Sequence, residues 1–492
     1  MGLHFMAVLG TSLYEPIKYS KGVDWETKEE EEFIQLAYVE KWKEELKKDG
    51  KVTIFVTDFS EKRNWKDREY DLNDQNFAAK WNSDKKKNVI VGGKKKGMET
   101  QITERFPELK DKIECIKIPD GKNEEEIDQQ FQIMFGALEQ GDEVVFDITH
   151  SFRSIPMLAM TVVNYARILL NCTLREIIYG AFEARNRDTN IAPIFDLTMY
   201  NEILEWTGAA EMFIQYGNAR PMNELVKKKK AMLANNEKST LCWLENRTRD
   251  MALLTDNIAT CRGQRADCVT GKSAAGSSIQ KAYLNMQGNK ECTPQNRENR
   301  EIKPLLPLIE KAEKSLEAFH CEENYKVGMQ VVKWSIKNNM IQQGYTALEE
   351  SVKTYLCSYC DVDDALKEER ENFIGNILGV FNKALQNCGQ DTIENRNKVY
   401  ERWLADDRAQ TSLKDFFEDQ VEKRKELAKK VIFEVDWELV KKSIVLMERR
   451  NDINHFGMRK DPFSSEKLKK DLNQMYLEIK DAVERMEKRK IK

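Results

Sequence analysis

Over its first 200 residues, the chain alternates short apolar runs with segments of helical periodicity. Runs of this length, apolar on both faces and spaced by helices, predict a mainly parallel, doubly wound α/β sheet. We expect helices near 29–48, 98–106, 124–139 and 155–170. We interpret the apolar runs as the strands His4–Leu9, Val52–Val56, Val89–Val91, Ile113–Ile118, Glu143–Asp147 and Glu176–Tyr179.

The rest of the chain has helical periodicity, apart from residues 255–302. That stretch is rich in Gly, Ser, Asn, Gln and Thr and shows no clear period, so we interpret it as a polar, partly flexible insertion. After Pro304 the pattern predicts an all-α bundle, with helices near 307–320, 325–356, 364–387, 393–404, 412–430, 436–457 and 464–490. We therefore predict a ligand-sensing domain over 1–205, a helical linker with its insertion over 206–304 and a helical domain over 305–492.

Composition restricts the class of protein. No apolar run is long enough to span a membrane, and the ten cysteines form no disulfide framework, so we expect a cytoplasmic protein without membrane association. No secretory leader is visible at the apolar start, Phe5–Leu9. The net charge of −4 does not favour nucleic acid, but residues 421–492 hold 20 Lys and Arg against 14 Asp and Glu. This local excess fits an RNA substrate and also fits ordinary solvated helix faces.

Two predicted strands end in polar residues. Gly10, Thr11 and Ser12 follow the first strand, and Thr149-His150-Ser151-Phe152-Arg153 follows the strand that ends at Asp147. Ligands of doubly wound sheets bind at the carboxyl ends of the strands, and hydroxyl, imidazole and guanidinium groups at a helix N-terminus suit an anion. The sequence therefore predicts a ligand site here. The alternative is that these residues only cap a helix.

Near the chain's end lies Arg450-Asn451-Asp452-Ile453-Asn454-His455. On a helix, the apolar stripe of Val440, Ile444 and Met447 continues into Arg450, Asn454, Asn451 and His455, spread over about 140°. A cation, two amides and an imidazole together suit a phosphodiester. Alternatively, these side chains form a satisfied polar cluster at a helix end that stops at Gly457.

These patterns together resemble a known family. Leu9-Gly10-Thr11-Ser12, Asn64-Trp65 and Asp147-Ile148-Thr149-His150-Ser151-Phe152-Arg153 resemble CRISPR-associated Rossmann-fold (CARF) sensor domains. The Arg450-to-His455 pattern, with Asn directly after Arg, resembles the R-x4-H motif of HEPN ribonucleases. The chain thus resembles the CARF–HEPN ancillary ribonucleases of type III CRISPR systems over about residues 1–210 and 305–492.

The resemblance implies a Rossmann-like CARF sheet, a HEPN helical bundle, and a homodimer or higher homo-oligomer. The implied activator is a cyclic oligoadenylate, of four or six nucleotides (cA4 or cA6), and the activity is metal-independent cleavage of single-stranded RNA with a 2′,3′-cyclic phosphate product. No metal or other cofactor is implied. His455 would transfer protons, Arg450 would hold the scissile phosphate, and Asn451 and Asn454 would orient the imidazole or the substrate. The implied ligand-binding residues are Gly10, Thr11, Ser12, Thr149, His150, Ser151, Phe152, Arg153, Gly180 and Glu183.

Two alternatives stay open: a non-catalytic nucleotide sensor that regulates a partner, and a toxin-like HEPN ribonuclease without an activator. Two other motifs are weaker. Gly271-Lys272-Ser273 lacks the first glycine and the preceding strand of a phosphate-binding loop. Cys357 and Cys360 form a lone C-x-x-C pair without a second pair to complete a zinc site.

Overall fold

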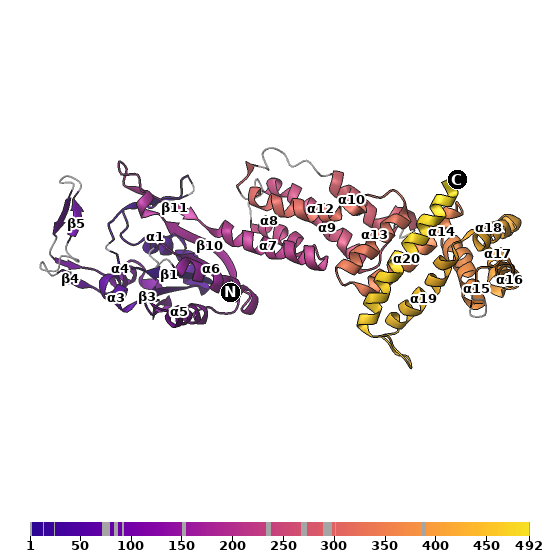
Figure 1. The fold of residues 1–492 in the computed structure, drawn as a ribbon. Coiled ribbons are helices and arrows are strands. Elements are labelled where there is room, and N and C mark those ends of the chain that lie inside the picture. Colours follow the sequence, from indigo (N-terminus) through magenta and orange to yellow (C-terminus); the bar gives the residue numbers. More distant parts are fainter. Residues whose placement is uncertain are drawn as a thin grey trace. The chain divides into compact units, whose positions relative to one another are not determined.

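The protein is described by a computed structural model that divides into two compact units, Met1–Ile203 and Leu204–Lys492 (Figure 1). We call them the N-terminal unit and the C-terminal unit. The predicted boundary near residue 304, between the helical linker and the helical domain, stays a prediction. The structure describes residues 2–12, 14–23, 25–70, 79–82, 87–90, 93–149, 154–232, 238–266, 273–288, 298–300, 302–385 and 390–491.

A seven-stranded sheet forms the N-terminal unit, with the strand order β2-β11-β10-β9-β1-β3-β8. The strands from β8 to β10 run parallel, β11 is antiparallel to β10, and β2 pairs parallel with β11. The predicted mainly parallel sheet is therefore confirmed. The strands are β1 (Leu3–Leu9), β2 (Lys18–Ser20), β3 (Lys51–Val56), β8 (Ile113–Lys117), β9 (Glu143–Asp147), β10 (Thr173–Gly180) and β11 (Ile191–Asp196).

Helices cover both faces of this sheet, because successive residues of a buried strand point to opposite sides. Phe5 and Ala7 of β1 pack in one core with α1 (Ile34–Lys41), α2 (Lys43–Asp49) and α4 (Met98–Arg105). Met6 and Val8 of the same strand pack in a second core with α5 (Glu124–Gly136) and α6 (Ile155–Leu169).

One predicted strand of this sheet is wrong. The run Val89–Val91 was expected in the main sheet, but Lys87–Ile90 forms β6, which pairs antiparallel with β5 (Ala79–Asn82) in a separate hairpin. The run has only three apolar residues among lysines, too few for a strand buried on both faces. A second small antiparallel pair joins β4 (Arg68–Tyr70) to β7 (Gly93–Lys95).

The C-terminal unit is mainly helical, as predicted. Its largest core joins α13, α14 and the helices that follow. The predicted helix 325–356 is in fact two, because the chain breaks at Asn338–Met340, where Asn339 has a φ of +58°. The helices are α7 (Thr198–Tyr216), which contains the boundary between the units, α8 (Arg220–Met232), α9 (Lys238–Ala259), α10 (Ser278–Gly288), α12 (Leu306–Leu316), α13 (Asn324–Lys337), α14 (Ile341–Tyr359), the π-helix η6 (Glu368–Gly375), α15 (Asn376–Leu385), α16 (Ile393–Leu404), α17 (Asp407–Phe416), α18 (Val421–Glu434), α19 (Trp437–Asn454) and α20 (Ser465–Ile491).

Part of the segment interpreted as an insertion without periodicity is regular. Its described residues form the hairpin of β12 (Gln264–Ala266) and β13 (Ser273–Ser277), followed by α10, which packs on α9. Ile279, Ala282, Tyr283 and Met286 are buried at helical spacing. The polar residues between them concealed this period in the sequence. No helix of the described residues has the length and apolarity needed to cross a membrane.

Candidate functional sites in the two units

The candidate ligand site lies where β1 and β9 end side by side. The two strands are parallel neighbours, with Ala7 opposite Asp147. After β1 the chain adds β3 and then β8 on one side of β1. After β9 it adds β10 on the opposite side of the sheet. The loops after β1 and β9 therefore leave the sheet at its topological switch point, where ligands of such sheets bind.

A buried asparagine fixes the loop that follows β1. Asn64, 1% exposed, lies in the π-helical turn η1 (Glu61–Trp65). Its Nδ2 donates hydrogen bonds to the carbonyl oxygens of Gly10 at 2.8 Å and Ser12 at 2.9 Å. With its own carbonyls held by Asn64, this loop leaves Thr11 half-buried and Ser12 exposed. The loop is thus held in place before any ligand binds.

A second set of hydrogen bonds joins the ends of β9 and β10. Asp147 accepts hydrogen bonds from the Thr149 backbone N–H at 3.0 Å and from the Thr149 hydroxyl at 2.5 Å, and Gln35 donates to its other oxygen at 2.5 Å. The Thr149 hydroxyl in turn accepts from the Gly180 N–H at 2.8 Å. Complete burial raises the pKa of Asp147 to about 6, because desolvation penalises the charged carboxylate.

Gly180 is required at this point by close packing. A Cβ added there would lie 2.6 Å from Cδ1 of Ile34 and 3.3 Å from Cγ2 of Thr149. Any larger residue would therefore clash with Ile34 and crowd Thr149 at the strand edge.

The structure brings together part of the predicted ligand set. Gly10, Thr11, Ser12, Thr149 and Gly180 lie on neighbouring strand ends, while Glu183 is exposed in the short helix η3 (Phe182–Ala184). His150, Ser151, Phe152 and Arg153 lie outside the described residues. Sequence reasoning missed Gln35, and no pattern around it in the sequence indicates a contact with Asp147. The ligand-binding roles stay predictions.

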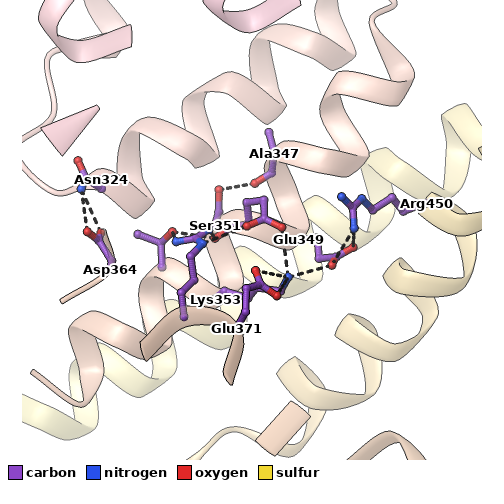
Figure 2. A network of polar contacts seen from close by, with 11 residues as sticks. Asn324, Ala347, Glu349, Ser351, Lys353, Asp364, Glu371 and Arg450 are labelled. Atoms are coloured by element: carbon purple, nitrogen blue, oxygen red, sulfur yellow. Dashed lines mark hydrogen bonds and ion pairs between the residues drawn. The ribbon is translucent and has the colours of Figure 1, made fainter. Parts of the chain in front are cut away.

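In the C-terminal unit, Arg450 lies on α19 and turns toward α14. Its Nη1 lies 3.2 Å from both carboxylate oxygens of Glu349, and its side chain is 29% exposed (Figure 2). Its Nε is buried without a hydrogen-bond partner among the described residues. The ion pair orients the guanidinium while part of it stays accessible to solvent.

Glu349 belongs to a wider charge network. Lys353, one helical turn later on α14, lies 3.3 Å from Glu349, 3.2 Å from Glu350 and 3.1 Å from Glu371 of η6 (Figure 2). Arg370 pairs with Glu350 at 2.6 Å. Three cations and three carboxylates therefore balance around Arg450. Sequence reasoning missed Glu349. The one signal in the sequence is that Glu349 and Glu350 form an acidic pair on α14, whose other residues are largely buried.

A cavity of about 330 Å³ lies beside this network, within the C-terminal unit. Arg450 lines it together with residues of α13, α14 and the end of α9. Glu350 and Arg370 of the charge network line the same cavity, so the network borders this space directly.

His455 ends α19 at the surface. The helix closes with a Schellman motif, in which the Phe456 N–H donates to the Ile453 carbonyl at 3.0 Å and the Gly457 N–H to the Asp452 carbonyl at 2.8 Å. Phe456 takes the left-handed position directly after the C-cap, His455, and Gly457, the predicted stop, follows it with a φ of +67°. The side chain of His455 is exposed. This termination directs the imidazole into solvent.

The other residues of the motif divide into exposed and structural groups. Asn451 and Asn454 are exposed near His455. Asp452, in contrast, is 4% exposed and accepts a hydrogen bond from the Phe463 backbone N–H at 3.4 Å, which ties the helix end to the following segment. The preceding Arg449 pairs with Asp471 of α20 at 2.9 Å. Of the two consecutive arginines, only Arg450 therefore adjoins the charge network.

The described residues contain no group of three or more His, Cys, Asp or Glu side chains placed to hold a metal ion. Cys357 and Cys360 are both buried. Burial raises the pKa of each thiol to about 12, so both stay protonated at neutral pH.

Comparisons with known proteins relate this geometry to a family. Residues 5–184 match the family model described as the CARF domain of the CRISPR system endoribonuclease Csx1. The CRISPR-associated protein MJ1674 of Methanocaldococcus jannaschii is 34% identical over 115 residues, which is 23% of this chain and 18% of that protein. The chain thus matches less than a fifth of this relative. The predicted CARF domain is confirmed for the N-terminal unit, and the family match does not extend into the C-terminal unit.

A solved structure is similar over a longer range but weakly. Enterococcus italicus Csm6 bound to cyclic hexa-2′-fluoro-hexa-dAMP covers 99% of this chain and 94% of its own, with 10% identity and a TM-score of 0.40. A TM-score this low does not define a shared fold.

Proposed function

We propose that the protein is a cyclic-oligoadenylate-activated, metal-independent endoribonuclease that cleaves single-stranded RNA in CRISPR antiviral defence. The observation that carries the proposal is the end of α19, where exposed His455, Asn451 and Asn454 follow an arginine oriented by Glu349. The family match of the N-terminal unit supports the CRISPR context and the sensing role. A cytoplasmic location stays a prediction.

The sensing step uses the strand edge of the N-terminal unit. Thr11 and Ser12 offer hydroxyls from a loop held by Asn64, and Thr149 lies on the neighbouring strand end. Hydroxyls and backbone N–H groups at such an edge suit the riboses and phosphates of a cyclic oligoadenylate. Because the loop is already ordered, binding requires little rearrangement there.

The chemical step uses the ribose of the substrate as the nucleophile. The 2′-oxygen attacks the adjacent phosphorus, the bond from phosphorus to the 5′-oxygen breaks, and a 2′,3′-cyclic phosphate and a 5′-hydroxyl form. His455 accepts the 2′-OH proton or donates a proton to the leaving 5′-oxygen. Arg450 stabilises the charge that develops on the phosphoryl oxygens, and Asn451 and Asn454 orient the imidazole or the RNA.

This chemistry requires a second copy of the chain. On one helix, Arg450 and His455 project about 140° apart, so a single motif does not focus both on one phosphate. A two-fold related copy supplies another imidazole and another guanidinium to the same cleft. We therefore propose a homodimer, or a higher homo-oligomer, as the active form.

The test is product analysis of end-labelled single-stranded RNA incubated in EDTA with cyclic tri-, tetra- or hexa-adenylate. We expect cleavage with one of these rings, a 2′,3′-cyclic phosphate at the new end, and no cleavage of a matched DNA. Cleavage at equal rates without any ring would support the toxin-like alternative. Ring binding without RNA cleavage under any condition would support the non-catalytic sensor.

A further inference from the structure

The residue directly after His455 has a conformation that folding alone does not favour. Phe456 has a φ of +57°, in the left-handed region, at the Schellman position that glycine usually occupies. A side chain with a Cβ is strained there, and a bulky aromatic one more than most.

The same side chain gains almost nothing from burial. Phe456 is 88% exposed, whereas the next most exposed phenylalanine of the described residues, Phe416, is 50% exposed. An aromatic ring stabilises a fold through the apolar surface that it removes from water, and this ring removes little. Strain together with exposure at one residue indicates a role toward a molecule outside the chain.

The exposed cations beside the ring indicate what that molecule is. Arg459 and Lys460, three and four positions after Phe456, are both exposed. Arg459 also pairs with Glu448 at 3.3 Å, whereas Arg449 and Arg450 pair with Asp471 and Glu349. A polyanion such as single-stranded RNA is attracted to these exposed cations beside the ring.

We propose that Phe456 is a stacking platform for an unpaired nucleobase of single-stranded RNA, beside the linkage on which His455 acts. The proposal rests on the proposed function and names the substrate contact of that site. Consecutive Cα atoms lie about 3.8 Å apart, so a base stacked on this ring places its own ribose close to the imidazole. Stacking on an aromatic ring tolerates any base, which suits an enzyme that recognises single strands rather than one sequence.

The test is binding of fluorescent single-stranded RNA to the full-length protein in an H455A background, where RNA stays intact. We expect F456A to weaken binding by roughly tenfold or more, F456W to retain binding, and the neighbouring control M458A to bind normally. An RNA with an abasic position near the cleavage site should bind the parent protein less tightly but F456A no less tightly. Equal abasic effects in both proteins would overturn the proposal.

Two further measurements exclude other roles for the ring. F456G relieves the left-handed strain, so it should melt at a higher temperature than the parent and still lose RNA affinity. A lower melting temperature would assign Phe456 to the fold and contradict the proposal.

Sedimentation of F456A should show unchanged self-association. Loss of the oligomer would assign the ring to a contact between copies and contradict the proposal. If no RNA is cleaved but F456A still weakens RNA binding, the proposed function fails and the platform remains.

Discussion

The two candidate sites differ in what holds their residues. In the N-terminal unit, buried hydrogen bonds position backbone loops: Asn64 holds the loop after β1, and Asp147 and Thr149 join β9 to β10. In the C-terminal unit, side chains on one helix end are positioned by an ion pair and by the way the helix stops. The first site is fixed by burial and the second is open to solvent. Substitutions at the strand ends should therefore weaken ligand binding by disturbing the local structure. Substitutions at the end of α19 should lower the rate of RNA cleavage without altering the fold.

The largest effect is expected for H455A. Because the imidazole is exposed, its removal should leave the melting temperature unchanged while RNA cleavage falls by about a thousandfold, within the range of a lost general acid or base. The rate is measured with labelled RNA at saturating activator. H320A, which removes another exposed histidine, is the control and should cleave normally. Normal cleavage by H455A would place the chemistry elsewhere.

R450A should have the second largest effect. We expect kcat to fall by about a hundredfold, as for the loss of one hydrogen-bond donor to the transition state. It also leaves Glu349 with Lys353 as its remaining partner, so a small fall in melting temperature is expected. The matched variant R449A removes the contact with Asp471 and should lower stability with little change in kcat. Equal losses of kcat in both variants would refute the distinction between the two arginines.

N64D tests the buried site. The carboxylate cannot donate to the Gly10 and Ser12 carbonyls and faces them with negative charge, so the loop should lose its preformed shape. We expect the activator concentration for half-maximal cleavage to rise by roughly 10- to 100-fold, with the maximal rate less affected. N164D, on α6, is the control and should respond as the parent does. An unchanged activator response in N64D would remove this loop from the site.

D147N should have the smallest effect, on the pH dependence of stability. The folded pKa of Asp147, about 6, is raised above its unfolded value, so its contribution is favourable below about pH 4 and is lost as pH rises through 6. The variant should therefore melt near the parent at pH 4 and a few degrees, about 2–6 °C, above it at pH 7.5. Gln35 can rotate its own amide to accept a hydrogen bond from the introduced amide, so the contact is retained. A difference that does not change with pH would show that Asp147 titrates normally.

The sequence predicted elements well where burial imposes a simple period. Strand Glu143–Asp147 and helix 393–404 agree with the structure to the residue. The strand is an apolar run between two acidic residues, and the helix buries Val399 and Trp403 at helical spacing after its N-cap, Thr392. The meeting of the strand ends could be predicted, since topology alone brings Gly10 and Thr149 together, while their binding of a ligand stays a prediction. The partners that hold them could not be predicted. Gln35 and Glu349 lie far along the chain from the groups they bind, and their positions depend on packing that no local period encodes.

The end of α19 also has features that the sequence could not predict. The Arg450-to-His455 spacing predicts a shared face, yet it does not show that Arg450 turns toward Glu349 while His455 points to solvent. Nor does it show that Phe456 rather than Gly457 takes the left-handed position of the Schellman motif. Both follow from how the helix packs and stops.

The central claim is that a ligand at the strand edge of one unit controls cleavage by the helix end of the other. The most direct measurement is the initial rate of single-stranded RNA cleavage, in EDTA, as a function of cyclic oligoadenylate concentration. The account predicts a saturable rise from a near-zero rate with one ring size and a shift of that curve to higher concentration in N64D. A rate independent of every ring at all concentrations would contradict it.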